Sequence, residues 1–357
     1  MTGRPSVLLS YFDIIFQIGH VLPHTNSSCD AADLPPVVVI SEAMATRLIG
    51  IEDAITAVES ALASLDSGTS RAFAFSSGEG PGPGTRLGVK AGYDGLSCHP
   101  GAKLGSYWSE NSRAGLANHG STTLLLDDRT GRPCAFVAAS YLTALRTAAA
   151  DAVAVKYLAR ASASRLSILG SGHQAFYEAL AVAEVRQLDQ VSIWSRDPAA
   201  AVRLALRLRE AGLPARAVEI EEAVTQADIL CTVTASTQPL FDAALAAPGI
   251  HISAMGADGP GKQELPSALV ESALLFTDLV SQSIVIGEFQ HACRSGRVDP
   301  DRISPLGAVI NGTATGRTSD HQTTIFDSSG VAVQDIAIAA LALARARDSG
   351  MAHEIEF

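Results

Sequence analysis

The sequence is poor in basic residues and in charge. Of its 357 residues only 18% are charged, and 26 Lys and Arg against 37 Asp and Glu give a net charge of −11. This excess disfavours nucleic acid and anionic membrane surfaces as partners, because both are polyanions. A small anionic substrate stays compatible with it, since a local cluster of Arg and Lys is enough to bind one carboxylate.

Cysteine is also scarce, and no two cysteines form a CxxC pair. The five are odd in number and scattered along the chain: Cys29, Cys98, Cys134, Cys231 and Cys293. This spacing predicts neither a disulfide framework nor a zinc site. We therefore expect no metal, a reducing cytoplasmic location and free thiols; a catalytic cysteine is the alternative.

Long apolar runs are missing as well. Residues 7–22 are apolar, but Asp13 and Gln17 interrupt the run, and it is too short to cross a bilayer. We expect no membrane span, and we interpret residues 1–35 as a poorly ordered extension before the folded part.

Two different sequence patterns along the chain predict two domains of an α/β protein. Short strands with Gly/Pro-rich turns fill the first part, whereas strands and helices alternate after a long Ala-rich helix at 142–158. Such alternation predicts a parallel sheet. The expected architecture is a Rossmann domain inserted into a discontinuous α+β outer domain, with boundaries at 141–319 for the former and at 36–140 and 320–357 for the latter.

The clearest motif is a glycine-rich turn between a strand at 165–169 and a helix that starts near Phe176. Its glycines permit a tight turn and close approach of a pyrophosphate to the helix N-terminus, while Ala175 lets helix and strand pack closely. The alternative is an ordinary strand-to-helix turn. The residues that we expect at a dinucleotide are Gly170, Ser171, Gly172, His173, Gln174, Ala175 and Thr234.

The end of the next strand bears on the choice of dinucleotide. An acidic residue there usually binds the ribose 2′-hydroxyl of NAD, whereas arginine accommodates the 2′-phosphate of NADP. Ser195 and Arg196 therefore favour NADP(H), and Asp197, one position later, keeps NAD(H) possible. A plain surface arginine at a strand end is the alternative for Arg196.

Four segments in this order resemble the ornithine cyclodeaminase/mu-crystallin family: LTALRTAAADA at 142–152, GSGHQA at 170–175, GADGPGKQEL at 256–265 and FDSSG at 326–330. The resemblance runs from about Val37 to the C-terminus. It implies a homodimer, a Rossmann domain inserted in an outer domain that binds substrate, and hydride exchange at the α-carbon of an amino or imino acid.

The resemblance also implies roles for single residues. Lys103 is similar to the family's active-site lysine, and Asp258 to an acid/base aspartate. Arg146 and Arg71 resemble a pair that clamps the substrate carboxylate, for which a planar guanidinium is suited. His119 is expected near the cofactor and substrate. The ordinary alternatives are a solvated strand lysine, a turn aspartate and a structural histidine.

Three activities fit this family. The first is NAD(P)H-dependent reduction of a small α-imino acid, or the reverse dehydrogenation; the second is an ornithine- or lysine-type cyclodeaminase; the third is non-catalytic NADP binding of the mu-crystallin kind. Lys103, Arg146 and Asp258 together disfavour the third. The segment at 90–108 resembles the branch that includes iminosuccinate reductase, and besides Asp258 we find no acceptor for a side-chain amine. We expect a reductase.

Lys90 adds a hypothesis about the substrate. If strands at 87–93 and 102–108 form a hairpin centred near Leu96 and Ser97, Lys90 lies opposite Lys103 on the same face. Facing ammonium groups are unfavourable unless an anion lies between them or one is neutral. The pair thus predicts Lys90 as a substrate-binding residue and favours a dicarboxylic imino acid over ornithine. A one-residue bulge would instead turn Lys90 to solvent.

Overall fold

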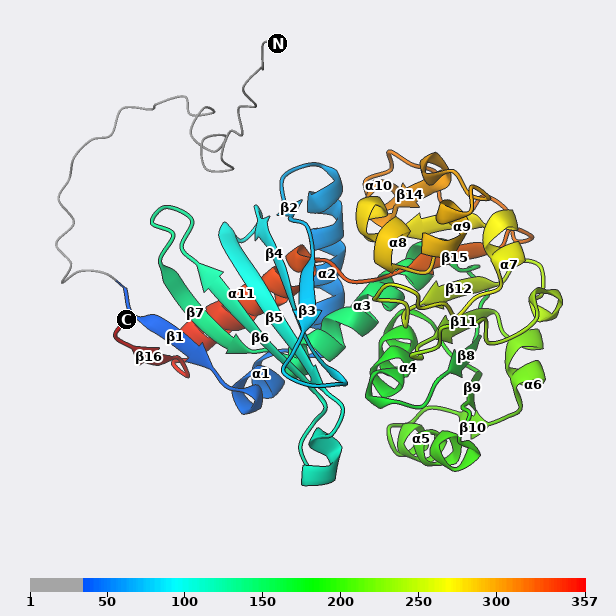
Figure 1. The fold of residues 1–357 in the computed structure, drawn as a ribbon, viewed down its shortest axis with the longest axis horizontal. Helices are drawn as coiled ribbons and strands as arrows, with labels where there is room; N and C mark the ends of the chain where they lie inside the picture. The colour runs from blue at the N-terminus through cyan, green and yellow to red at the C-terminus, as the bar shows by residue number, and fades with distance from the viewer. Residues whose placement is uncertain (1–34) are drawn as a thin grey trace, which may run out of the picture. The chain divides into compact units, whose positions relative to one another are not determined.

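The computed structural model describes residues 35–357, so the extension expected at 1–35 lies, but for Pro35, outside the described residues. The described chain forms two sheets of eight strands with helices packed on them (Figure 1). In this part of the chain no helix combines the length and apolarity needed to cross a membrane. Its four cysteines are free thiols.

The first sheet joins residues from both ends of the described chain. Its order is β16-β1-β7-β6-β5-β4-β2, with β3 paired to β4. The strands are β1 Val37–Ile40, β2 Arg71–Ala72, β3 Ser76–Glu79, β4 Thr85–Asp94, β5 His99–Trp108, β6 His119–Leu126, β7 Pro133–Ala138 and β16 His353–Ile355. All neighbours are antiparallel except β1 and β7, which are parallel.

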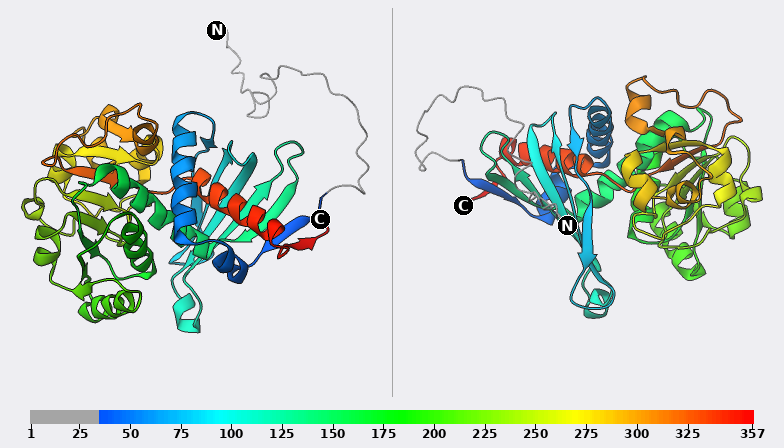
Figure 2. Two further views of the ribbon diagram at one scale, coloured as in Figure 1. Left: turned by 180° about the vertical axis from the view of Figure 1, so that it is seen from behind. Right: turned by 45° about the horizontal axis from the view of Figure 1, so that its top comes forward.

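Helix α11 (Ala332–Asp348) lies across one face of this sheet beside α2 (Ile51–Asp66), as the view from behind shows (Figure 2). A Cβ on Gly92 would lie 3.2 Å from Cβ of Ala332, and one on Gly101 3.1 Å from Cγ1 of Ile336. These two strand glycines therefore let the first turns of α11 pack directly on the backbone of β4 and β5. The same face continues from these glycines to Lys90 and Lys103.

The second sheet is parallel throughout, in the order β10-β9-β8-β11-β12-β15-β13-β14. Its strands are β8 Arg165–Leu169, β9 Gln190–Trp194, β10 Ala215–Ala217, β11 Ile229–Thr232, β12 His251–Ala254, β13 Leu274–Thr277, β14 Ile303–Pro305 and β15 Thr324–Asp327. Because β15 pairs with β12 and β13, this sheet reaches Asp327, and the boundary expected at 319/320 falls inside it. The four residues of β15 are all buried. The sequence of a strand that is buried on both faces does not indicate which of the two sheets it joins.

The remaining helices connect these strands. They are α1 Glu42–Leu48, α4 His173–Val185, α5 Pro198–Glu210, α6 Ile220–Thr225, α7 Ser267–Ser272, α8 Val280–Ile286, α9 Gln290–Arg294 and α10 Leu306–Ile310, with short 3-10 helices at Asn111–Ala114, Ala243–Leu245 and Pro300–Arg302.

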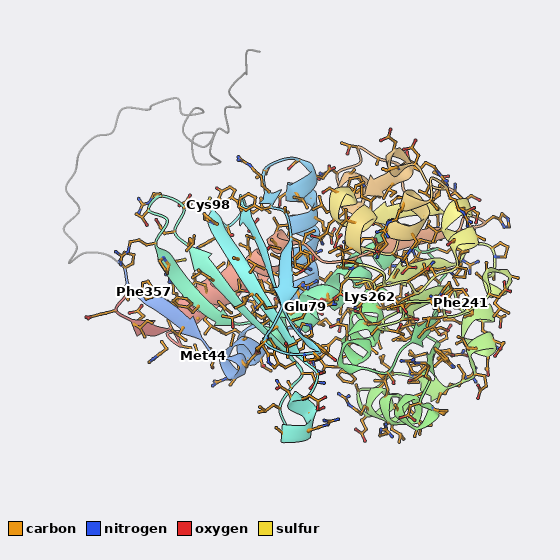
Figure 3. All side chains as sticks on the ribbon, in the orientation of Figure 1. Met44, Glu79, Cys98, Phe241, Lys262 and Phe357 are labelled. Atoms are coloured by element: carbon orange, nitrogen blue, oxygen red, sulfur yellow. The ribbon has the colours of Figure 1, made fainter. Side chains whose placement is uncertain are left out.

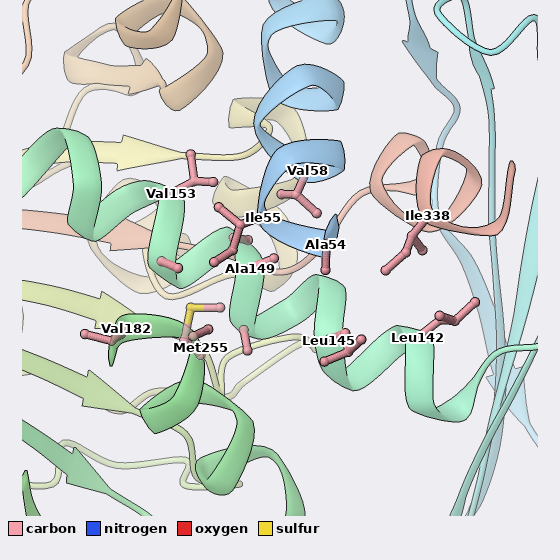
Figure 4. Close-up of a cluster of buried hydrophobic side chains, with 14 of the residues drawn as sticks. Ala54, Ile55, Val58, Leu142, Leu145, Ala149, Val153, Val182, Met255 and Ile338 are labelled. Atoms are coloured by element: carbon pink, nitrogen blue, oxygen red, sulfur yellow. The ribbon is translucent and has the colours of Figure 1, made fainter. Parts of the chain in front are cut away.

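Helix α3 (Ser140–Leu158) is buried along most of its length and touches α2, α4 and α11 as well as β6 of the first sheet and β12 of the second. Its many alanines allow neighbouring helices to approach closely. A cluster around it contains Ala54, Ile55, Val58, Leu142, Leu145, Ala149, Val153, Val182, Met255 and Ile338 (Figure 4). Close packing of this kind fixes the position of each side chain on α3, including that of the buried Arg146.

Candidate active site

Lys90 and Lys103 lie directly opposite each other in the β4–β5 hairpin. The pairing predicted from the sequence is therefore present, and no bulge intervenes. Lys103 is buried, with 6% of its surface exposed. The Nζ atom of Lys90 donates to the carbonyl oxygen of Ser329 at 2.6 Å and lies 5.5 Å from the centre of the Phe75 ring.

The counterion of this cationic group is Asp335, which the sequence analysis missed. One of its oxygens, Oδ1, accepts from Lys103 Nζ at 2.7 Å and from Arg146 Nε at 2.9 Å. Oδ2 is buried without a hydrogen-bond partner among the described residues. Asp335 lies in the first turn of α11, where a carboxylate is also favoured by the helix dipole.

The electrostatic balance at this group leaves positive charge in excess. Burial, followed by the proximity of Arg146, lowers the pKa of Lys103 to about 7, and the attraction of Asp335 does not offset these effects. Burial likewise lowers the pKa of Lys90. For Asp335, burial would raise the pKa, but Arg146 and the two lysines outweigh it and lower the value. Asp335 is thus ionised, and Lys103 titrates near neutrality.

Arg146 is held between α3 and the turn before α11. Gly330 has a φ of 74°, and a Cβ there would overlap the guanidinium of Arg146, so this turn requires glycine. Asp278 accepts from the backbone N–H of Gly330 at 2.7 Å and from Ser328 Oγ at 3.0 Å. The turn that carries the Ser329 carbonyl is thereby fixed between the two sheets.

Asp258 follows β12 on an exposed loop and forms an ion pair with Lys262. Lys262 is labelled in Figure 3. Lys262 also donates to the carbonyl of Gly256 at 3.1 Å. Desolvation would raise the pKa of Asp258, but Lys262, then Lys90, outweigh it, so its pKa lies below the ordinary value. Asp258 is therefore a carboxylate at neutral pH.

Glu264, fully buried, ties the loops after β11 and β12 together. Its Oε1 accepts from the backbone N–H of Thr234 at 2.6 Å, and its Oε2 accepts from Gly256 N at 2.9 Å and Thr232 Oγ1 at 2.8 Å. These bonds place Thr234, one of the expected cofactor residues, next to the Asp258 loop. The carboxyl ends of adjacent parallel strands are where such sheets bind ligands.

The glycine-rich turn fits a dinucleotide. Gly170 has a φ of 134°, and a Cβ there would lie 2.7 Å from the carbonyl oxygen of Val233. A Cβ on Gly172 would have no atom within 4 Å, and no side chain caps the N-terminus of α4. The free N–H groups of the helix therefore face open space, as a pyrophosphate requires. Ser171 Oγ lies 2.9 Å from Ser195 Oγ across the turn.

At the tip of β9, Arg196 and Asp197 differ in their surroundings. Asp197 caps α5 by accepting from Ala199 N at 3.0 Å, and it pairs with Arg203 at 3.2 Å. Arg196 is exposed, and its side chain forms no ion pair or hydrogen bond with any residue of 35–357. The acidic residue is therefore engaged by its own helix, whereas the arginine is free for a ligand.

The other turn residues, His173 and Gln174, begin α4. The Gln174 amide donates to Ala144 O at 3.0 Å and to Glu178 Oε1 at 2.8 Å, so it joins α4 to α3.

Glu178 and Asp151 are fully buried next to Cys231, with one polar atom of each within 4.8 Å of the others. Burial raises the pKa of Asp151 to about 6 and that of Glu178 well above the ordinary value, so the two carboxyl groups hold a proton.

Two further expected residues are placed differently from one another. His119 begins β6 opposite Tyr107, on the face of Lys103, and its ring centre lies 6.1 Å from that of Tyr107. Arg71 pairs with Tyr93, and a strand alternates its faces, so Arg71 lies on the face away from Lys90. The structure therefore brings His119 to the site. Arg71 is exposed on β2, the edge strand of the first sheet, and does not reach the site.

A parallel sheet with an open glycine turn, next to a buried group of cations on a second domain, defines a nicotinamide-dinucleotide-dependent oxidoreductase with a Rossmann-type domain. The chain belongs to the ornithine cyclodeaminase/mu-crystallin family, whose model matches residues 37–350.

Two curated relatives are similar over most of their length. Iminosuccinate reductase of Paracoccus denitrificans is 44% identical over 269 residues, which cover 75% of this chain and 84% of the relative. Alanine dehydrogenase of Archaeoglobus fulgidus is 32% identical over 325 residues, which cover 89% and 98%.

Solved structures agree with these relatives. The Paracoccus denitrificans iminosuccinate reductase in complex with NAD+ superposes with a TM-score of 0.86 at 39% identity, covering 90% of this chain and all of that one. The Δ1-pyrroline-2-carboxylate reductase of Thermococcus litoralis, in complex with NADH and L-proline, has a TM-score of 0.85 at 28% identity, covering 89% and 100%. The family and fold expected from the sequence are confirmed.

Proposed function

We propose that this chain is an NAD(P)H-dependent reductase that converts a small α-imino acid into the L-amino acid, and that catalyses the reverse dehydrogenation. The observation that carries the proposal is the group of Lys103 and Arg146, buried around one carboxylate. Lys90, paired with Lys103 across the hairpin, also contributes to lowering the pKa of Asp258 on the loop after β12. The relatives named above act on imino or amino acids of this kind.

The residues of the site have separate roles in substrate binding and in catalysis. Arg146 and Lys103 bind the α-carboxylate, for which the excess positive charge of the site is suited. Asp258, as a carboxylate, accepts a hydrogen bond from the protonated imine nitrogen and stabilises its charge. The bound nicotinamide supplies the hydride. Because a protonated imine needs only a hydride to become an amine, no separate proton donor is required, which agrees with the lowered pKa of Asp258.

The dinucleotide is held by residues 170–175, Ser195, Arg196 and Thr234. An unpaired arginine at the strand tip favours NADP(H) by offering a partner to the 2′-phosphate. The two solved relatives hold NAD+ and NADH, and NAD(H) therefore stands as the competing cofactor. Direct titration with both reduced forms decides between them.

A homodimer is part of the proposal. On the face of the first sheet away from α11, Leu87 and Leu104 are 41% and 48% exposed, and Phe73 in the adjoining segment is 57% exposed. Large exposed apolar side chains grouped on one sheet face are typical of an interface. A solved archaeal alanine dehydrogenase of the same fold, with a TM-score of 0.86 and 31% identity, is described as a dimer.

One assay tests the function. The purified chain is incubated with NADPH or NADH and, in turn, with pyruvate plus ammonia, oxaloacetate plus ammonia, pyrroline-2-carboxylate or ornithine. We expect oxidation of the dinucleotide with one or more of the first three. Ammonia release from ornithine without net change in the dinucleotide would instead identify a cyclodeaminase, and no turnover with any substrate would support a binding protein.

A further inference from the structure

The face of the first sheet that carries Lys103 is ordered in rows across β4, β5 and β6. The register places Lys90, Lys103 and Thr123 in one row, and Arg86, Tyr107 and His119 in another. Between these rows lies a row of small residues, Gly88, Gly105 and Ser121. Residues two apart on a strand share a face, so all three rows point to the side of α11 and Asp335.

The middle row leaves room for a ligand. A Cβ on Gly105 would have only the carbonyl oxygen of Gly88 within 4 Å, at 3.9 Å. The ring of Phe75 covers Gly88, since a Cβ there would lie 2.9 Å from it, and the same ring contacts Lys90. The space over Gly105 is therefore open and is bordered by the Phe75 ring.

The outer row carries a cation without a partner. The Arg86 side chain is exposed and forms no ion pair or hydrogen bond within residues 35–357. Its Nη1 lies 3.7 Å from the position of a Cβ on Gly259, so the guanidinium reaches the loop of Asp258. His119 shares this row, and burial lowers the pKa of its ring. Arg86 and Lys90 are four positions apart, or about 13 Å along the strand, and the two long side chains can shorten this distance by leaning toward each other.

We infer that Arg86, assisted by His119, binds a second carboxylate and makes the site selective for a dicarboxylic imino acid of about four carbons. The inference rests on the proposed function and names its substrate class. The α-carboxylate occupies the row of Lys103 with Arg146, the carbon chain lies over Gly105, and the distal carboxylate meets the guanidinium fork. Lys90 is engaged with the Ser329 carbonyl, so the distal charge is assigned to Arg86 rather than to Lys90.

The test compares Arg86→Gln with wild type on two substrates, oxaloacetate plus ammonia and pyruvate plus ammonia. We expect the ratio of kcat/KM for the dicarboxylate to that for the monocarboxylate to fall roughly 10- to 100-fold, as for loss of a hydrogen-bonded contact to a charged group. Arg129→Gln is the matched control, because Arg129 is an exposed arginine at the other end of β6, and it should keep the wild-type ratio.

Calorimetric titration of the enzyme–dinucleotide complex with L-aspartate and L-alanine gives the same comparison without turnover. Arg86→Gln should weaken L-aspartate far more than L-alanine. An unchanged ratio in both measurements, an equal loss for both ligands, or a wild type that prefers the monocarboxylate would overturn the inference. Absence of turnover with all imino acids would refute the proposed function, while the binding comparison would still decide the role of Arg86.

Discussion

Replacing Asp335 by Asn removes the only negative charge that touches both Lys103 and Arg146 in the described chain, while keeping the shape of the side chain. Asp335 is 2% exposed, and Lys103 and Arg146 are each 6% exposed, so water does not screen the two remaining positive charges. Removing one partner of a buried ion pair typically costs about 3–5 kcal/mol. We expect about 3 kcal/mol at pH 6, because the amide oxygen of Asn still accepts one of the two bonds.

The loss should become smaller as the pH rises. Without Asp335 the pKa of Lys103 falls further below its present value of about 7. The folded variant then binds fewer protons than the folded wild type over that window, so its relative stability improves with increasing pH. A shift of one unit would recover about 1.4 kcal/mol. A neutral lysine also binds a carboxylate poorly, so kcat/KM should begin to decline at a lower pH than in wild type.

Urea unfolding at pH 6 and pH 8.5, together with the pH profile of kcat/KM, measures both effects. Asp228→Asn is the control, because Asp228 bridges Arg160 at 2.6 Å and Arg165 at 2.9 Å away from this group. It should lose stability and keep the wild-type pH profile. An Asp335→Asn variant with less than about 0.5 kcal/mol of destabilisation, the scatter expected of ordinary surface changes, and an unshifted profile would refute the reasoning.

Four further changes test other parts of the argument. Arg146→Ala should lose roughly 2–5 kcal/mol of substrate binding, seen as a raised KM, and fluorescence titration should show dinucleotide binding intact; ordinary turnover at low substrate would contradict the clamp. Burial raises the pKa of Asp151 to about 6 and also that of Glu178, so wild-type stability falls as pH rises through that range, and Glu178→Gln should be more stable than wild type at pH 8 in urea unfolding; a loss of stability there would count against the shared proton. Leu104→Asp should give a monomer by analytical ultracentrifugation, and a dimer as stable as wild type would move the interface elsewhere. Arg196→Asp should reverse or flatten a preference for NADPH over NADH in fluorescence titration, whereas a wild type that favours NADH would show that Arg196 does not select the cofactor.

The sequence predicted best those elements that have a strong local signal. The bounds of β8 agree with the strand expected at 165–169, because this short and mostly apolar run is buried from Leu166 to Leu169 and is followed by the glycine-rich turn. The short strands β3, β10, β14 and β16 were not predicted. Each has three or four residues, too few for a clear periodic pattern.

The same distinction applies to the site. The pairing of Lys90 with Lys103 followed from one hairpin, in which the position of the turn sets the register. Asp335 meets Lys103 across 232 residues and Arg146 across 189. An acid in the first turn of a helix is common for reasons of helix stability alone, so nothing in the local sequence distinguishes this one. Its role depends on how α11 packs against β4 and β5.

This packing also explains why the site needs a ligand. Lys103 and Arg146 both contact one oxygen of Asp335, and Lys90 lies opposite Lys103 in the hairpin. Burial, and then the proximity of Arg146, lowers the pKa of Lys103 to about 7. Burying like charges together costs stability unless an anion compensates them. An α-carboxylate supplies that anion and favours the charged form of Lys103. The excess of buried positive charge therefore destabilises the folded chain and at the same time gives it affinity for a carboxylate. A neutral or cationic group in the same place would leave this positive charge uncompensated.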